Sequence, residues 1–362
     1  MKKIVAALLC VVLLLGAVGC SQTSAPPSKP TSSSEPEPVH LPKNPLTGVE
    51  GLSEEAVGKR PVAVMINNID EALPQYGIGA ADILVEALVE GGITRLMAIY
   101  GDYTKIPNVC SIRSARYYYP LIALSFDAVY VHWGHETTYA EDVFQSYDIT
   151  RICGDWNDGD LFDRDEARLN EGYAWEHTGY FKGPQLPAAL KELGKRTDLN
   201  SAHQGMAFLF RDETAPAAPT GEGAQEVRVE YSASYISSFT YDEASKTYLK
   251  LRDGKPHVDG KTGRQLAFTN ILTLETGVSH LTDILMDIEV VGEGEGTWIS
   301  NGAAQRIRWS KADAYSKIIL TDLEGNPLKL NAGKTYLGYV SEGNVTVTAP
   351  APAVEPSAAS AE

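Results

Sequence analysis

Arg113 and Arg116 lie close together in the segment SIRSAR, where their spacing favours the binding of an anion. We predict a helix over residues 113–125, and side chains three positions apart share one face of its first turn. Because the backbone dipole makes a helix start positive, two guanidinium groups there need a compensating negative charge. A phosphate or carboxylate ligand would supply that charge. The alternative is an internal carboxylate such as Glu86 or Glu90, which would make the arginines structural.

The predicted strand DAVYVHWGH ends in a second group of side chains that could do chemistry. In α/β folds, ligands tend to bind beyond the carboxyl ends of the strands. His132 or His177 could act there as a general acid or base, because imidazoles titrate near neutral pH. The alternative is a zinc site with His132, His135 and Glu136 as ligands. Their spacing differs from that of the helical zinc motifs, so we predict no cofactor.

Aromatic residues surround both segments, and some of them could form the walls of a pocket. Trp133 and Trp175 each lie within two residues of a histidine. Aromatic walls beside arginines and histidines suit a sugar or a sugar phosphate. For any single aromatic residue, packing in the core is the alternative. The predicted ligand site consists of Asn67, Arg95, Arg113, Ser114, Arg116, His132 and His177.

Residues 1–20, MKKIVAALLCVVLLLGAVGC, have the pattern of a lipoprotein signal peptide. Lys2 and Lys3 form a positive start, and an apolar run of twelve residues reaches Leu15. That run is short for a membrane-spanning helix. The end of the segment, AVGC, resembles a lipobox, so we predict an extracytoplasmic protein anchored to the cytoplasmic membrane by a lipid on Cys20. A cleaved signal with an incidental cysteine is the alternative.

The formal net charge of the chain is −16, and it becomes −18 once Lys2 and Lys3 leave with the signal peptide. A surface with this much negative charge binds nucleic acid and anionic lipid poorly. We therefore predict no nucleic-acid partner. An anionic ligand must therefore meet a local basic pocket. Once the signal is cleaved and Cys20 lipidated, Cys110 and Cys153 remain, either joined in a disulfide or as two buried thiols.

Composition divides the rest of the chain into five segments. Residues 21–43 are a disordered tether rich in Ser and Pro, which lacks the apolar content to bury a core. The predicted α/β domain with the candidate pocket covers residues 44–212, and a linker covers 213–226. Residues 227–349 form the second, smaller domain. Residues 350–362 are a disordered tail rich in Ala and Pro.

Helical and strand patterns alternate in the first domain, which indicates a mixed α/β fold. PVAVMINN is a predicted strand that ends at Asn67 and Asn68. DILVEALVE and ITRLMAIY flank Gly91-Gly92 and predict a hairpin, with a helix over residues 82–90 as the alternative. TTYAEDVFQSY and PQLPAALKELG are predicted helices, and MAFLFRD is a predicted closing strand. The second domain has short, alternating segments such as VRVEY, TYLKLR and QRIRWS, which indicate an all-β sandwich or barrel.

The order of these motifs resembles that of the YerB-like lipoproteins, a bacterial family defined by a domain of unknown function. The resemblance rests on PVAVMINN, EGGITR, IRSAR, VHWG and EHTGY, and in the second domain on TNILTLET and RIRWSK. It covers about residues 44–349. Family members tend to have Gly-Pro where this chain has Cys110-Ser111. The resemblance implies a lipoprotein with two domains, and it implies no particular activity.

These observations favour a binding or accessory protein of the cell envelope that holds an anionic or sugar-like ligand. Two alternatives stay open. The first is a hydrolase acting on an envelope glycan or phosphodiester, with a histidine as general acid or base. The second is an envelope scaffold whose β domain docks a partner.

Overall fold

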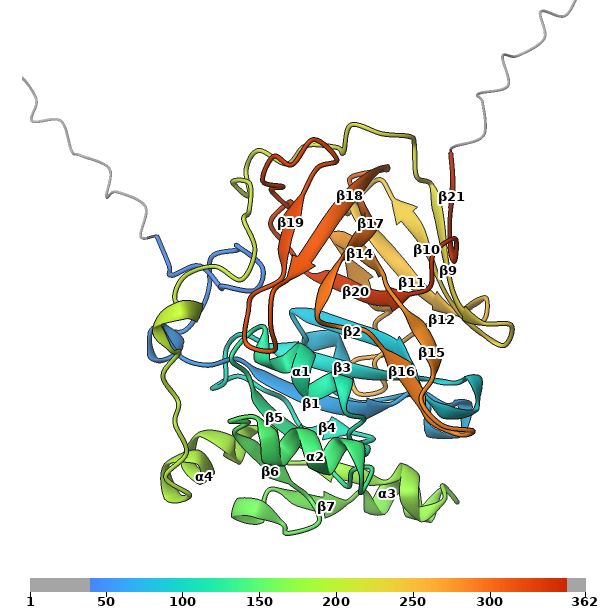
Figure 1. The fold of residues 1–362 in the computed structure, drawn as a ribbon. Coiled ribbons are helices and arrows are strands. Elements are labelled where there is room, and N and C mark those ends of the chain that lie inside the picture. The colour runs from blue at the N-terminus through green and yellow to red at the C-terminus, as the bar shows by residue number, and fades with distance from the viewer. Residues whose placement is uncertain (1–39, 350–362) are drawn as a thin grey trace, which may run out of the picture. The chain divides into compact units, whose positions relative to one another are not determined.

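A sheet of ten strands runs through the computed structural model, which describes residues 40–349. Its order is β19-β18-β17-β14-β20-β2-β3-β1-β5-β6, so five adjacent strands come from each half of the chain (Figure 1). At the junction, β2 (Ile83–Leu88) pairs in parallel with β20 (Thr335–Val340). The N-terminal region mixes helices with strands and the C-terminal region is all-β, as predicted. One hydrogen-bonded sheet therefore joins the two regions, which the sequence did not suggest.

The remaining strands of this sheet are β1 (Val62–Asn67), β3 (Thr94–Tyr100), β5 (Val129–His132), β6 (Arg151–Cys153), β14 (Asn270–Glu275), β17 (Gly292–Ser300), β18 (Ala303–Lys311) and β19 (Ile319–Thr321). Strands β1, β5 and β6 are parallel neighbours, so their carboxyl ends meet at one edge. Strand β3 runs antiparallel to β1 and β2, and it places Arg95 opposite Asn67.

A second sheet of six strands contains β9 (Glu226–Ser232), β10 (Tyr235–Asp242), β11 (Thr247–Arg252), β12 (Lys255–Pro256), β13 (Ala267–Phe268) and β21 (Val345–Thr348). A three-stranded sheet contains β4 (Val109–Cys110), β7 (Phe162–Arg164) and β8 (Gly179–Phe181), and a pair contains β15 (Val278–His280) and β16 (Met286–Ile288). The α-helices are α1 (Tyr118–Leu124), α2 (Tyr139–Ser146), α3 (Glu166–Asn170) and α4 (Leu186–Glu192).

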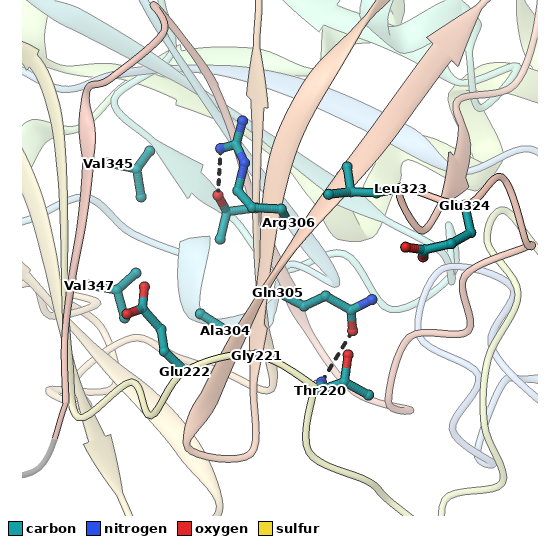
Figure 2. Close-up of a pocket in the computed structure, with 11 residues that line it drawn as sticks. Thr220, Gly221, Glu222, Ala304, Gln305, Arg306, Leu323, Glu324, Val345 and Val347 are labelled. Carbon is teal, nitrogen blue, oxygen red and sulfur yellow. Dashed lines mark hydrogen bonds between the residues drawn. The ribbon is translucent and has the colours of Figure 1, made fainter.

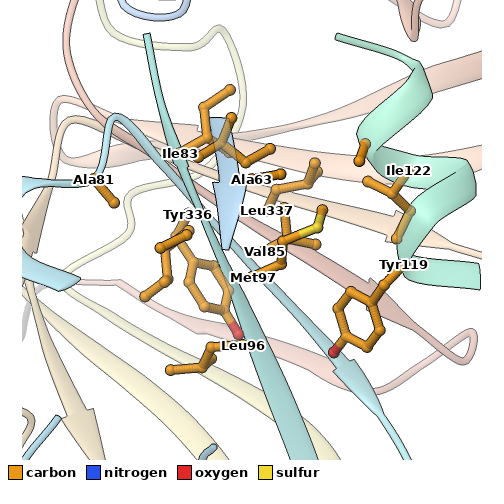
Figure 3. Close-up of a cluster of buried hydrophobic side chains, with 14 of the residues drawn as sticks. Ala63, Ala81, Ile83, Val85, Leu96, Met97, Tyr119, Ile122, Tyr336 and Leu337 are labelled. Carbon is orange, nitrogen blue, oxygen red and sulfur yellow. The ribbon is translucent and has the colours of Figure 1, made fainter. Parts of the chain in front are cut away.

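The core occupies both faces of the central strands. Because side chains alternate along a strand, Met97 and Leu96 of β3 point to opposite faces. Tyr119 and Ile122 of α1 approach one face, and Tyr336 lies with Leu96 on the other (Figure 3). All six residues of β2 are buried, since helix α1 covers one face and strands of the second sheet cover the other. This explains why its sequence shows a continuous apolar run around Glu86.

Several predicted elements are confirmed. Strands β2 and β3 form the hairpin around Gly91-Gly92, both at positive φ, so the alternative helix over 82–90 is wrong. Helices α2 and α4 lie within TTYAEDVFQSY and PQLPAALKELG. The C-terminal strands divide between two facing sheets, as in a sandwich; the hydroxyls of Tyr231 and Tyr336 meet across them at 2.6 Å.

Two expectations are corrected. The predicted closing strand MAFLFRD forms only an isolated bridge, between Phe210 and Leu330. The helix predicted over residues 113–125 begins at Tyr118, so neither Arg113 nor Arg116 lies in it.

The sequence left open whether the two cysteines of the folded part are joined in a disulfide. Cys110 and Cys153 are buried free thiols.

Candidate functional site

The segment that contains Arg113 is extended and crosses the carboxyl ends of β1 and β5. The backbone N–H of Arg113 donates to the carbonyl of Met65 at 3.1 Å, and its own carbonyl accepts from Trp133 N at 3.1 Å. Two residues on, Ala115 N donates to the carbonyl of Gly134 at 2.9 Å. Because these strand ends take up its backbone groups, the segment cannot form the intrahelical hydrogen bonds that a helix from Arg113 requires.

Arg95 and Arg116 converge on the single carboxylate of Glu90. Arg95 Nη2 lies 3.1 Å from Glu90 Oε1, and Arg116 Nε lies 2.8 Å from Oε2. Burial raises the pKa of Glu90, but the hydrogen bond from Arg116 and the charge of Arg95 outweigh it and lower the pKa below its ordinary value. Burial and the nearby charge of Arg116 lower the pKa of Arg95 to about 10. Glu90 is therefore the internal anion that the sequence offered as an alternative to a ligand.

Arg113 completes the cluster without a carboxylate of its own. Among residues 40–349, no Asp or Glu oxygen lies within 4.0 Å of its guanidinium nitrogens. Its Nη1 donates weakly to the carbonyl of Glu176 at 3.4 Å, and its buried Nε has no hydrogen-bond partner in this part of the chain. The arginine cluster, defined as Arg95, Arg113 and Arg116, thus carries three positive charges: Glu90 pairs with Arg95 and Arg116, and the carboxylate of Glu176 is the main negative charge near Arg113.

Asn67 and His177, both predicted site residues, contact one another directly. Asn67 Nδ2 lies 3.1 Å from His177 Nδ1, while Asn67 Oδ1 accepts from the backbone N–H of Ile69. The amide nitrogen must therefore donate to Nδ1, which leaves the proton of the neutral ring on Nε2. Burial lowers the pKa of His177; the charge of Glu176 opposes this effect, and the charge of Arg113 adds to it. His177 is consequently neutral near pH 7 and presents an Nε2–H donor close to Glu176.

An aromatic flank, defined as Trp133, Arg164 and Trp175, lies beside Arg113. The guanidinium of Arg164 stacks 3.9 Å from the ring centre of Trp133 and 4.5 Å from that of Trp175. Its Nη1 also donates to the carbonyl of Trp175 at 2.9 Å. Trp175 is 61% exposed, which is unusual for so large an apolar side chain. The sequence identified both tryptophans but missed Arg164, because nothing in its spacing sets it apart.

Ser114 contacts Arg95 through its backbone carbonyl and Gly134 through its hydroxyl. Its carbonyl accepts from Arg95 Nη1. Its hydroxyl lies against Gly134, which has φ of +81°, and a Cβ on Gly134 would lie 2.7 Å from Ser114 Oγ. The close contact and the positive φ both require glycine at this position.

His132 is placed in the core, which corrects its prediction as a ligand or catalytic residue. The side chain has no exposed surface, and the ring stacks on Phe144 at 5.1 Å between centres. Its Nδ1 lies 2.8 Å from the carbonyl of Gly134. Burial lowers the pKa of His132 to about 3. A hydrolytic role for this residue has no basis, because a neutral ring without exposed surface cannot exchange protons with a substrate.

The zinc alternative is also corrected, because its three ligands face different partners. His135 Nε2 lies 2.9 Å from Glu141 Oε2. The carboxylate of Glu136 accepts from the backbone N–H groups at the start of α2, including that of Tyr139 at 2.6 Å. Within residues 40–349, no group of three His, Cys, Asp or Glu side chains is arranged to hold a metal ion.

A second polar group, which the sequence did not predict, is buried where the two sheets meet. Glu86 Oε1 accepts from Asn68 Nδ2 at 3.1 Å, and its Oε2 accepts from Ser237 Oγ at 2.7 Å. Lys250 Nζ lies 3.5 Å from the same Oε2, and both charged side chains are almost fully buried. Tyr336 also donates to Glu86. These contacts are internal and satisfied, which indicates a structural role.

A pocket of about 420 Å³ lies between β18, β21 and the loop at residues 220–222 (Figure 2). Arg306 lines it, but its guanidinium is bound by Glu275 Oε2 at 2.8 Å and by Glu295 Oε2 at 2.9 Å. Gln305 points away from Arg306 and accepts from Thr220 N. With its cation already neutralised, this pocket is a poor anion site.

Similarity to known proteins shows the family to which this chain belongs. Its residues 46–196 match the domain described as "Protein of unknown function (DUF3048) N-terminal domain", and residues 227–337 match the corresponding C-terminal domain. The Bacillus subtilis (strain 168) protein named "Putative lipoprotein YerB" is 29% identical over 340 residues, which cover 92% of this chain and 94% of that protein. The crystal structure of YerB protein from Bacillus subtilis superposes with a TM-score of 0.73 at 28% identity and covers 84% of this chain and 99% of that one. The chain therefore belongs to the two-domain DUF3048 family and is similar to YerB over most of its length.

Proposed function

We propose that this chain is an envelope lipoprotein that is held at the outer face of the cytoplasmic membrane by a lipid on Cys20. The lipobox-like pattern before Cys20 and the name of the Bacillus subtilis relative support this address. Cys20 itself lies outside the described residues. Between residues 40 and 349, no helix is long and apolar enough to cross a bilayer. A lipid anchor would hold the folded part at the membrane surface.

At that surface, the arginine cluster would bind an anionic ligand. The observation that carries this proposal is the excess of three guanidinium groups over the two nearby carboxylates, Glu90 and Glu176, in a chain whose net charge is −16. Arg113 is the residue with unused donors, and His177 offers an Nε2–H beside it. Charge-assisted hydrogen bonds from guanidinium groups are strong and suit the geometry of phosphate and carboxylate.

The aromatic flank indicates that the anion belongs to a sugar-like molecule. Trp133 and Trp175 lie next to Arg113 rather than in the centre of the core, and Trp175 is mostly exposed. Arg164 stacks on both rings and Trp133 packs against the core, so the exposed part of Trp175 is the aromatic surface that suits the apolar face of a sugar ring. We therefore propose an envelope carbohydrate that carries a phosphate or carboxylate as the ligand class.

Titration calorimetry of the full chain with glucose 6-phosphate, inorganic phosphate and glucose tests this proposal. Binding of glucose 6-phosphate should exceed that of either fragment. Arg113→Ala should weaken it about tenfold, the effect of losing one charge-assisted hydrogen bond. The control is Arg228→Ala, which removes a surface arginine that pairs with Glu230. Equal weakening by both variants, or no binding of either anion, would refute the proposed site.

A further inference from the structure

Glu176 brings a second carboxylate to the arginine cluster, and this one is open to solvent. Its side chain is 62% exposed, against 30% for that of Glu90. Glu90 is bound by two guanidinium groups, whereas no Lys or Arg nitrogen of residues 40–349 lies within 4.0 Å of the Glu176 carboxylate. The carboxylate of Glu176 therefore keeps its acceptor sites for a ligand.

Two donors beside this carboxylate are also accessible. Arg113 Nη1 donates to the backbone carbonyl of Glu176 at 3.4 Å, which keeps the guanidinium next to this residue. Arg113 Nη2 and His177 Nε2 make no hydrogen bond within residues 40–349, and neither is one of the polar atoms that the protein encloses without a partner. Solvent therefore reaches both atoms, in contrast to Arg113 Nε. Burial lowers the pKa of Arg113, and the charge of Glu176 opposes this effect.

The distance between His177 Nε2 and Glu176 Oε1 suits a bridging hydroxyl group. At 3.8 Å it is too long for a direct hydrogen bond. His177 Nε2 carries the ring proton and can only donate, whereas a carboxylate can only accept. A hydroxyl oxygen at about 2.8 Å from both atoms would accept from the imidazole and donate to the carboxylate. A phosphate or carboxylate oxygen has no proton for Glu176, and the two negative charges would repel each other.

We propose that Glu176 is the specificity-determining residue of this site and selects anions that carry a hydroxyl-bearing sugar. The inference rests on the proposed function, because Arg113 holds the anionic group while Glu176 and His177 bind a sugar hydroxyl. The 3₁₀ turn η6 (Trp175–His177) supplies both residues together with the exposed tryptophan of the aromatic flank. A small anion meets the charge of Glu176 and gains nothing in return, which is how an unfavourable contact creates specificity.

Calorimetric titration of the full chain with glucose 6-phosphate and with methyl phosphate tests this inference. Both ligands carry the same phosphate monoester, and only the first has sugar hydroxyls. The wild type should bind glucose 6-phosphate about tenfold more tightly than methyl phosphate. In Glu176→Gln, both ligands escape the repulsion, so methyl phosphate should bind about threefold more tightly. Glucose 6-phosphate also loses a charge-assisted hydrogen bond, so the preference for it should fall about fivefold.

The matched control is Glu171→Gln, which changes an exposed glutamate at the end of α3. It should leave both affinities unchanged. If Glu176→Gln and Glu171→Gln show the same preference for glucose 6-phosphate, Glu176 does not determine specificity, although the site at Arg113 stands. If the wild type binds neither ligand, the proposed function and this inference both fail.

The position of the Glu176 carboxylate can be checked without a ligand, by an NMR pH titration of the full chain labelled with ¹⁵N-histidine. Burial lowers the pKa of His177, and the charge of Glu176 opposes this effect. The other charges that act on the ring are those of Arg113, Glu71 and Arg168. Glu176→Gln should therefore lower the pKa of His177 further, whereas Glu171→Gln should not change it. An unchanged pKa in Glu176→Gln would place the carboxylate away from the ring and overturn the bridging hydroxyl.

Discussion

Asn67 and Asn68 are adjacent in the chain, but their side chains join two different networks. Asn67 Nδ2 lies 3.1 Å from His177 Nδ1, beside the arginine cluster. Asn68 Nδ2 lies 3.1 Å from Glu86 Oε1, in the buried group between the two sheets. Successive side chains of extended backbone point to opposite faces, so the end of β1 serves both networks. The two asparagines thus connect a candidate ligand site to the contact between the domains.

Glu90→Gln should destabilise the folded protein, because it leaves Arg95 buried beside Arg116 without a counterion. We expect a loss of about 2 kcal/mol in the free energy of unfolding, less than for a fully buried pair because Glu90 is 30% exposed. Inorganic phosphate should recover more stability in this variant than in the wild type, since the guanidinium groups have lost their internal anion. Urea unfolding with and without phosphate measures both effects.

The matched control for this variant is Glu192→Gln, which changes an exposed glutamate of α4. It should leave both the stability and the phosphate response unchanged within about 0.5 kcal/mol. A phosphate response of the same size in Glu90→Gln and in the control would show that Glu90 does not compete with an external anion.

His132 should make the protein sensitive to acid. Burial lowers its pKa to about 3 from an ordinary value of 6.5, so below pH 6.5 the unfolded chain binds a proton that the folded chain does not. Stability therefore falls as the pH falls from about 6.5 towards 3, and His132 alone accounts for about 2 kcal/mol of the loss between pH 7 and pH 5. Unfolding by urea at the two pH values should show a smaller loss in His132→Gln than in the wild type.

His280, which is exposed on β15, supplies the comparison for this measurement. His280→Gln should keep the full acid sensitivity of the wild type, because it changes an exposed side chain and leaves the buried imidazole of His132 in place. If His132→Gln and His280→Gln lose equal stability between pH 7 and pH 5, His132 is not the residue that disfavours protonation in the folded state.

Periodicity predicted individual elements well because it reports how each segment is buried. The hairpin of β2 and β3 follows from the two apolar runs on either side of Gly91-Gly92. The pairing of β2 with β20 could not be predicted, since it joins segments about 250 residues apart and an apolar strand does not specify its neighbour. The shared sheet was therefore missed, although the character of both regions was predicted correctly.

The ligand site stays a prediction, but the reason for grouping two of its residues was wrong. Arg113 and Arg116 were placed together because a helix was expected, whereas they lie on an extended segment from which Arg116 reaches Glu90. His132 was chosen for its place at a strand end, but alternation along β5 turns it into the aromatic core. Residues whose role depends on distant partners, such as Arg164, carry no local signal in the sequence.

The two cysteines of the folded part should be reduced and unreactive in the native protein. Cys110 and Cys153 are buried free thiols, and burial raises the pKa of Cys110 to about 12, so little thiolate forms at pH 8. Iodoacetamide should modify both only after unfolding in urea, as read from the masses of the peptides that contain them. Failure to modify them in urea without a reductant would reveal a disulfide.

Glu86 and Lys250 should stabilise the protein only as a pair. Each single variant, Glu86→Gln or Lys250→Met, leaves a buried charge without its partner and should cost about 3–5 kcal/mol. The double variant should cost at least 1 kcal/mol less than the sum of the single ones, because neither charge remains to be compensated. Urea unfolding of the four proteins measures this coupling energy. Additive effects would mean that Ser237 and Tyr336, rather than Lys250, hold the Glu86 carboxylate between the sheets.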